Sequence, residues 1–119
     1  LTAQTLNRVY RELNELYYEG ATVNELQEIE WARIPHFYNA FYVYQYATGF
    51  SAAVAIANRI LAEGEPAVKD YKKFLSSGGS SDPISLLKIA GVDMSSPEPV
   101  NSALKLFGEL IEEMEELNK

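Results

Sequence analysis

The sequence predicts an all-α fold, a helical bundle of about five helices formed by residues 1–119 as a single domain. Apolar residues recur at three- and four-residue spacing in several segments, which is the period of a helix with one buried face. Glycine, proline and capping residues punctuate those segments where helices would begin and end. No stretch alternates apolar and polar residues as a half-buried strand does, so no sheet is expected.

The N-terminal part of the chain predicts one long helix and one short helix. The long helix covers residues 3–18 and ends before Gly20. A short acidic turn follows over residues 24–30, where Asn24 is the expected N-cap and Gln27 stands at the capping-box position. The apolar stripe of the long helix comprises Leu6, Val9, Tyr10, Leu13, Leu16 and Tyr17.

The middle of the chain predicts a central buried helix. It runs from Tyr38 to about Leu61, is apolar on most faces, and has Gly64 just beyond it as a stop. Its second half is rich in alanine, which permits close contact between helices. On one continuous helix Tyr38, Tyr42 and Tyr46 would share a face, because they are four residues apart.

Two further helices are expected after the central one. Pro66 opens the first, and the serine- and glycine-rich segment 76–81 ends it. Asp82 and Pro83 then predict the N-cap and first turn of a short helix, which Gly91 ends.

The last expected helix also begins with an N-cap residue followed by a proline, Ser96 and Pro97, and it continues to about Leu117. One side of it is apolar. The other side carries a run of glutamates, which we interpret as a solvated face. The apolar side comprises Leu104, Phe107, Leu110, Ile111, Met114 and Leu117, and the glutamates are Glu109, Glu112, Glu113, Glu115 and Glu116.

Composition excludes several classes of partner. The net charge of −7, with lysine and arginine scattered along the chain, argues against nucleic acid. No apolar run approaches the roughly 18 residues of a membrane span, so no membrane is expected.

The expected location is the cytoplasm. The chain has no cysteine, which fits a reducing compartment. The first residues lack a targeting pattern.

Residues 30–53 differ in chemistry from the rest of the chain. They hold the only tryptophan, the only histidine and four of the eight tyrosines. Phenol and imidazole groups need hydrogen-bonding partners when buried, so this segment predicts a lined site. Pro35 disfavours helix at the preceding residue, which places His36 in a loop or a first turn. We interpret Trp31 as packing and Arg33 as a member of an ion pair.

The pattern alone leaves other interpretations open. A tyrosine stripe at helical spacing is more often core packing, and a lone histidine is more often structural. One histidine and no cysteine cannot build a His-based zinc site without further ligands. Phosphate-loop, calcium-loop and serine-hydrolase motifs are absent. The Gly78–Gly79 loop could cradle an anion, but such pairs are usually plain turns between helices.

Four segments resemble a known family. The run WARIPHFY at residues 31–38, followed by FYVYQYATGFSAA at 41–53, is similar to the C-terminal part of oligoendopeptidase F. That enzyme is a zinc metallopeptidase of the thimet-oligopeptidase-like group. The runs FLSSGGS at 74–80 and AGVDMSSP at 90–97 agree with the resemblance. It implies that the chain is the C-terminal fragment of a larger all-α metallopeptidase catalytic domain.

The resemblance also implies where the metal is bound. In that family zinc is held by a His-Glu-x-x-His helix and a downstream glutamate, all N-terminal to the portion seen here. The chain lacks them. Zinc is therefore expected in the complete parent enzyme, this chain alone is expected to bind no metal, and the isolated chain is expected to be inactive.

The resemblance assigns roles to the aromatic segment. The complete enzyme would hydrolyse oligopeptides, and His36 with Tyr42 and Tyr46 would donate hydrogen bonds to the oxygen on which negative charge develops. The residues expected to bind substrate are Tyr38, Tyr44, Gly78 and Gly79.

The sequence is also compatible with two other functional classes. One is a non-enzymatic helical module that binds a peptide or protein in an aromatic groove, and the other is a structural cap without a site. The expected macromolecular partner is the N-terminal part of the same enzyme, or a second copy bound through the exposed aromatic and alanine-rich face. A zinc-binding His-Glu-x-x-His motif in the parent reading frame would favour the enzyme.

Overall fold

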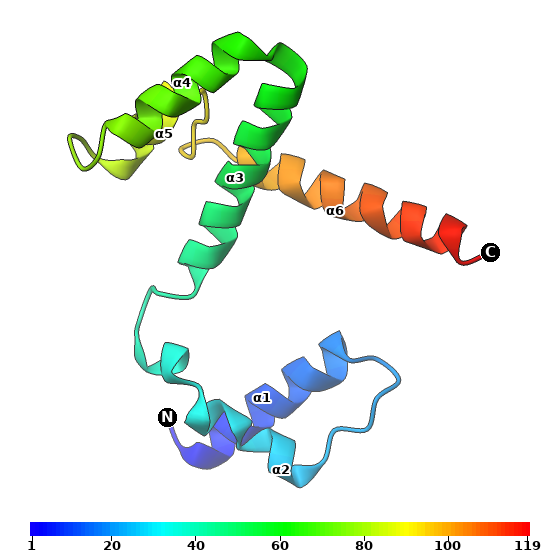
Figure 1. Ribbon diagram of the computed structural model, residues 1–119. Coiled ribbons are helices and arrows are strands. Elements are labelled where there is room, and N and C mark those ends of the chain that lie inside the picture. The colour runs from blue at the N-terminus through cyan, green and yellow to red at the C-terminus, as the bar shows by residue number, and fades with distance from the viewer. The chain divides into compact units, whose positions relative to one another are not determined.

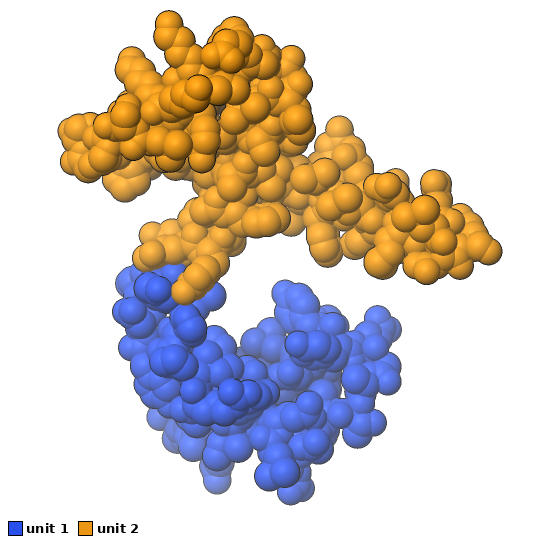
Figure 2. All heavy atoms as spheres, viewed as in Figure 1, with its two compact units in different colours: residues 1–43 blue, residues 44–119 orange.

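The computed structural model describes residues 1–119, and it confirms the all-α prediction (Figure 1). It contains six α-helices, two short 3-10 helices and no strand. The chain divides into two compact units, residues Leu1–Val43 and Tyr44–Lys119 (Figure 2). No helix combines the length and the apolar character that crossing a membrane requires.

The first unit consists of short helical segments around one long helix. Thr2 caps this long helix, α1, by accepting a hydrogen bond from the Thr5 N–H at 3.2 Å. Trp31 is half-buried and its Nε1 donates to Oδ1 of Asn7 at 2.8 Å, which ties the segment after α2 to α1. Val23 is the buried apolar residue of this unit. Its elements are α1 (Ala3–Tyr17), α2 (Glu25–Glu28), η1 (Glu30–Arg33) and η2 (Pro35–Tyr38).

The second unit holds the main core. Its four buried members are Ala52, Ile56, Ala90 and Val92, and larger half-buried side chains such as Phe74 pack around them. Small residues at the centre allow the backbones of α3 and its neighbours to approach closely. The elements are α3 (Tyr44–Glu63), α4 (Glu65–Ser76), α5 (Pro83–Ile89) and α6 (Glu98–Leu117).

Arg59 joins three parts of this unit. Its guanidinium donates to the Asp70 carboxylate on α4 at 2.8 Å and to the Ala90 carbonyl after α5 at 2.9 Å. It also donates to Glu63 on its own helix at 3.1 Å. Hydrogen bonds to Asp70 and then to Glu63 raise the pKa of Arg59. The side chain is 23% exposed, so most of it is shielded by the elements that it joins.

Most sequence-predicted helix signals are confirmed. Asn24 and Gln27 form the expected capping box at the start of α2. Gly64 separates α3 from α4 with φ of 69°, and Pro66 lies in the first turn of α4. Asp82 caps α5 by accepting from the Ser85 N–H at 3.0 Å.

The start of the central helix is a correction. The structure begins α3 at Tyr44, not at Tyr38, so Tyr38, Tyr42 and Tyr46 do not share a face of one helix. Tyr38 belongs to the 3-10 turn that Pro35 opens, and Phe41 has φ of 61°. A non-glycine residue in that left-handed region cannot continue a right-handed helix.

The expectation that this helix is buried holds only in part. Its buried residues are Ser51, Ala52 and Ile56, whereas Phe50 is 67% exposed. The alanine-rich half therefore supplies the core on one side only, while residues on the other side, such as Phe50, remain exposed within the second unit.

The predicted start of the last helix is displaced. Pro97 was expected in the first turn, with Ser96 as the N-cap. In the structure Pro97 is the N-cap of α6, and Pro99 is the proline of the first turn. Ser96 Oγ still accepts a hydrogen bond from the Glu98 N–H at 3.3 Å. The helix begins one residue later than predicted because Pro99 also has a backbone that fits a first turn. The glutamate run is exposed, as expected.

Candidate functional site

The predicted pair His36 and Tyr42 is brought together in the first unit. Their ring centroids are 5.6 Å apart, with the ring planes inclined by 35°. His36 lies in the 3-10 turn η2, as Pro35 predicted, and the preceding Ile34 is extended. An imidazole and a phenol each carry a hydrogen-bond donor, so this contact places two donor-bearing rings next to each other.

Two consecutive turns create this approach. The Asn39 N–H donates to the His36 carbonyl at 3.3 Å, and the Tyr42 N–H donates to the Asn39 carbonyl at 3.3 Å. The second turn requires the left-handed backbone of Phe41, whose side chain is 87% exposed. Such a conformation costs a non-glycine residue about 1–3 kcal/mol and is concentrated at functional sites. Sequence reasoning did not single out Phe41, because no composition signal marks a strained non-glycine residue.

The hydroxyl of Tyr38 has a partner in the backbone. It donates to the Ala32 carbonyl at 2.8 Å, which fastens η2 to the preceding turn. The ring remains 67% exposed. This tyrosine can therefore offer a ring surface to a ligand, while its hydroxyl stabilises the local fold.

Tyr44 and Tyr46 belong to the second unit, where they lie in the first turn of α3. Both are more than half exposed, at 59% and 57%. Of the three predicted donors, His36 and Tyr42 lie in the first unit and Tyr46 lies in the second.

Tyr44 borders a groove of about 910 Å³ in the second unit. Apolar side chains from α3, α4 and α5 form most of its wall, with Gln45, Thr48 and Asp82 as polar members. Hydrogen bonds from the Ser85 hydroxyl and then from the Ser85 N–H lower the pKa of Asp82. That carboxylate is occupied as the cap of α5. The apolar residues of the wall include Ile56, Ile60, Tyr71, Phe74, Ile84, Leu87 and Met94.

The Gly78–Gly79 pair lies in the turn between α4 and α5. Gly78 has φ of 53°, a conformation that glycine adopts without strain. The hydroxyls of Ser76 and Ser77 both donate to the Lys73 carbonyl, at 2.9 and 2.7 Å, and so finish α4. No heavy atom lies within 4 Å of the position where a Cβ would stand on either glycine. These features favour the plain-turn interpretation over an anion cradle.

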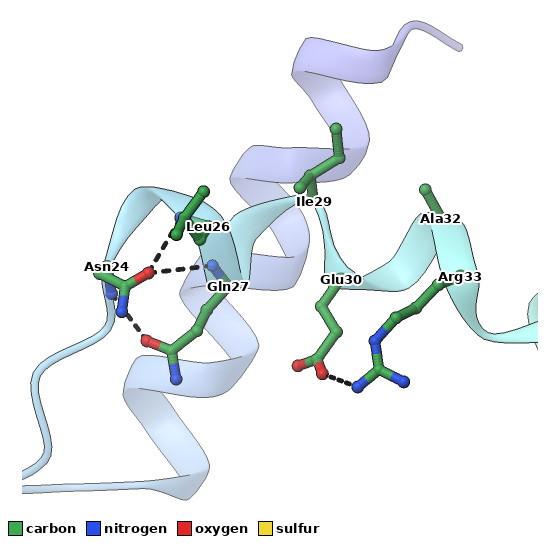
Figure 3. Close-up of a pocket in the computed structure, with 7 residues that line it drawn as sticks. All are labelled: Asn24, Leu26, Gln27, Ile29, Glu30, Ala32 and Arg33. Atoms are coloured by element: carbon green, nitrogen blue, oxygen red, sulfur yellow. Dashed lines mark hydrogen bonds and ion pairs between the residues drawn. The ribbon is translucent and has the colours of Figure 1, made fainter.

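A second hollow, of about 690 Å³, lies in the first unit beside α2 and η1 (Figure 3). Its polar side chains are already paired. Oδ1 of Asn24 accepts from the Leu26 and Gln27 N–H groups, and Gln27 accepts from the Asn24 N–H at 2.8 Å. Glu30 and Arg33 form the ion pair predicted for Arg33. The hollow could not be predicted from the sequence, because its residues serve the caps and the ion pair of local helices.

The chain has no set of side chains that fits a metal ion. No group of three or more histidine, aspartate or glutamate side chains is gathered for that purpose. A zinc site takes about three protein ligands. The residues of this chain therefore do not fit a zinc site of their own.

Comparison with known proteins connects these features to a family. A sequence model of Peptidase family M3 matches residues 1–106. The chain is 53% identical over 118 residues to an oligopeptidase PepF of Bacillus subtilis, covering 98% of the chain and 18% of that relative. It is 46% identical over 119 residues to the chromosomal oligoendopeptidase F of Lactococcus lactis, covering 98% of the chain and 20% of that relative.

A solved structure agrees with the sequence relatives. The crystal structure of oligoendopeptidase F from Enterococcus faecium superposes with a TM-score of 0.80 at 42% identity, over 99% of this chain and 23% of that chain. The chain thus spans about a fifth of the length of the relatives that it matches.

Proposed function

The chain belongs to peptidase family M3, and on this premise we propose that it is the C-terminal portion of an oligoendopeptidase that hydrolyses short peptides. Identity above 40% over nearly the whole chain supports the proposal. Oligopeptides are the proposed substrates and the cytoplasm is the proposed location. The rest of the same polypeptide would supply the remaining parts of the active site.

The closeness of the His36 and Tyr42 rings carries the proposal for the site. In peptide hydrolysis the attacked carbonyl oxygen gains negative charge as the carbon becomes tetrahedral. Donors held in place before that charge develops stabilise the transition state more than the substrate. His36 and Tyr42 would act as such donors, together with Tyr46 from the first turn of α3.

The remaining predicted residues would shape the channel for the peptide. The exposed rings of Tyr38 and Tyr44 would offer flat surfaces to the substrate. Gly78 and Gly79 would form a turn at the border of the channel. Zinc in the complete enzyme would supply the activated water, and residues outside this chain would hold it. No step assigned to the present residues depends on that metal.

Substitution in the complete enzyme tests the donor role. Tyr42→Phe and Tyr46→Phe remove one hydroxyl and keep the ring, and His36→Ala removes the imidazole. Each should lower kcat by roughly 10²- to 10³-fold with little change in KM, because the lost interaction strengthens only in the transition state. Metal content and Tm should change little. Steady-state kinetics on a quenched oligopeptide, with metal analysis and thermal unfolding, provide the measurements.

Tyr17→Phe is the matched control, because Tyr17 is a tyrosine of α1 that is 79% exposed and has no assigned role. It should keep normal kcat. If His36→Ala, Tyr42→Phe and Tyr46→Phe all keep near-normal kcat, the aromatic segment is a scaffold and the assignment is wrong.

The groove bordered by Tyr44 favours one competing function, a helical module that binds a peptide without cleaving it. Such a module would bind apolar peptides regardless of whether a metal site exists elsewhere in the polypeptide. Retention of peptide binding with no turnover in the complete, metal-loaded protein would favour this alternative.

A further inference from the structure

Helix α6 shows a row of large apolar side chains to solvent. Its buried residues, Pro99 and Ala103, both lie near its start, where it packs on α3. The C-terminal half extends beyond that contact (Figure 1). The exposed apolar residues, from 37% to 81% exposed, are Val100, Leu104, Phe107, Leu110, Ile111, Met114 and Leu117.

The spacing of these residues is that of a helix-pairing seam. Ala103, Phe107, Leu110, Met114 and Leu117 follow one another at intervals of four, three, four and three residues. This is the heptad pattern with which one helix packs along another. Scattered surface leucines would need no explanation, but a continuous stripe on a 20-residue helix marks a contact surface.

The charges beside the seam are all negative. At 100° per residue, Glu113 and Glu115 fall on opposite borders of the apolar stripe, whereas Glu112 and Glu116 fall on the far side of the helix. Lys105 pairs with Glu109 at 3.5 Å, away from the seam. A second copy of α6 would therefore bring its bordering glutamates against those of the first, which opposes self-pairing. A helix with lysine or arginine beside its apolar stripe would match both features.

From this match we propose that the seam of α6 receives an amphipathic helix, bordered by lysine or arginine, from the remaining part of the same polypeptide. The length supports this source, because the chain covers only 18–20% of the named relatives. The inference rests on the part of the proposed function that makes this chain a portion of a longer peptidase. It adds a partner and a surface that the donor site does not involve.

Hydrogen exchange tests the proposal by comparing the 119-residue chain with the full-length polypeptide from the same reading frame. Amides of residues 104–117 should exchange roughly 100-fold more slowly in the full-length protein, because several apolar side chains become covered. Glu113→Lys with Glu115→Lys should reduce that protection about tenfold. Glu112→Lys with Glu116→Lys, which makes the same change of charge on the far side of the helix, should leave it unchanged.

Three results would overturn the proposal. They are equal exchange of these amides in both proteins, equal effects of the two double variants, and protection in the 119-residue chain that rises with its concentration. The last result would identify a second copy as the occupant. The exchange experiment does not measure turnover. A failure of the donor assignment would therefore leave the proposal for α6 intact, and a failure of the proposal for α6 would leave the donor assignment intact.

Discussion

Gly91 is the residue at which backbone and side-chain constraints coincide. Its φ is 81°, and a Cβ built on it would collide with Nη1 of Arg59. Alanine at this position would meet the cost of a left-handed backbone, about 1–2 kcal/mol, and would displace the guanidinium. We expect Gly91→Ala to lower the free energy of unfolding by about 2 kcal/mol or more, measured by urea denaturation.

Gly108→Ala provides the control for that substitution. Gly108 lies inside α6 and has no heavy atom within 4 Å of the Cβ position. Alanine is a better helix former, so this variant should gain about 0.5–1 kcal/mol. Equal stability of the Gly91 and Gly108 variants would show that the contact of Gly91 with Arg59 has no energetic role.

Asp93 makes part of the stability dependent on pH. The Ser95 hydroxyl, the Ser95 N–H and Lys88 lower the pKa of its carboxyl from 3.8 to about 2 in the folded chain. A carboxyl with a lower pKa in the folded state stabilises that state above its unfolded pKa, and this contribution is lost as the pH falls. The loss should occur between pH 3.8 and about 2.

Asp93→Asn should therefore be less stable than the wild type near neutral pH, and the difference should shrink between pH 3.8 and about 2. Urea midpoints of both proteins across this range measure the difference. Ser95→Ala removes the hydrogen bond from the Ser95 hydroxyl, the first of the three interactions. It should therefore also reduce the change in stability over this pH range. A difference that stays constant down to pH 2 would refute the role of Asp93.

At the scale of the elements, Arg59 determines how α4 and the end of α5 are held on α3. Methionine keeps the apolar stem but loses the donors to Asp70 and to the Ala90 carbonyl. Arg59→Met should lower the urea midpoint of the second unit, and Arg59→Lys should recover only part of the loss, because an ammonium lacks the planar fork of donors. Circular dichroism during urea unfolding would measure both.

Arg8→Met is the corresponding control in α1. Arg8 is 64% exposed and pairs with Glu12 one turn away on the same helix. Such surface pairs contribute little, so the midpoint should hardly change. Similar losses for the Arg8 and Arg59 variants would show that charge alone, and not the joining of elements, explains the effect.

The elements that local chemistry specifies were predictable from the sequence. The caps at Asn24 and Asp82 and the stop at Gly64 depend only on neighbouring residues, and all three are confirmed. The start of α3 was not predictable, because Phe41 gives no composition signal for a left-handed backbone. The same loop brings Tyr42 to His36, so the residues of the candidate site could be named in advance, but not the turns that bring the pair together.

The main core and the proposed donor pair belong to different units of the chain. Ala52, Ile56, Ala90 and Val92 lie in the second unit, whereas His36 and Tyr42 lie in the first. The first unit also has many exposed apolar side chains for its 43 residues, Leu16 and Leu26 among them. A unit this small buries little apolar surface of its own.

We expect that the isolated 119-residue chain neither retains zinc nor cleaves peptides. It has one histidine and no cysteine, whereas tight zinc binding takes about three nitrogen, sulfur or carboxylate ligands at one place. His36 and Tyr42 would still face each other, because both lie in one unit, but donors without an activated nucleophile do not hydrolyse an amide. Metal analysis after dialysis and cleavage of a quenched oligopeptide by the pure chain measure the two properties. Stoichiometric zinc, or cleavage that a chelator stops, would mean that the chain carries a complete site and that its proposed dependence on the rest of the polypeptide is wrong.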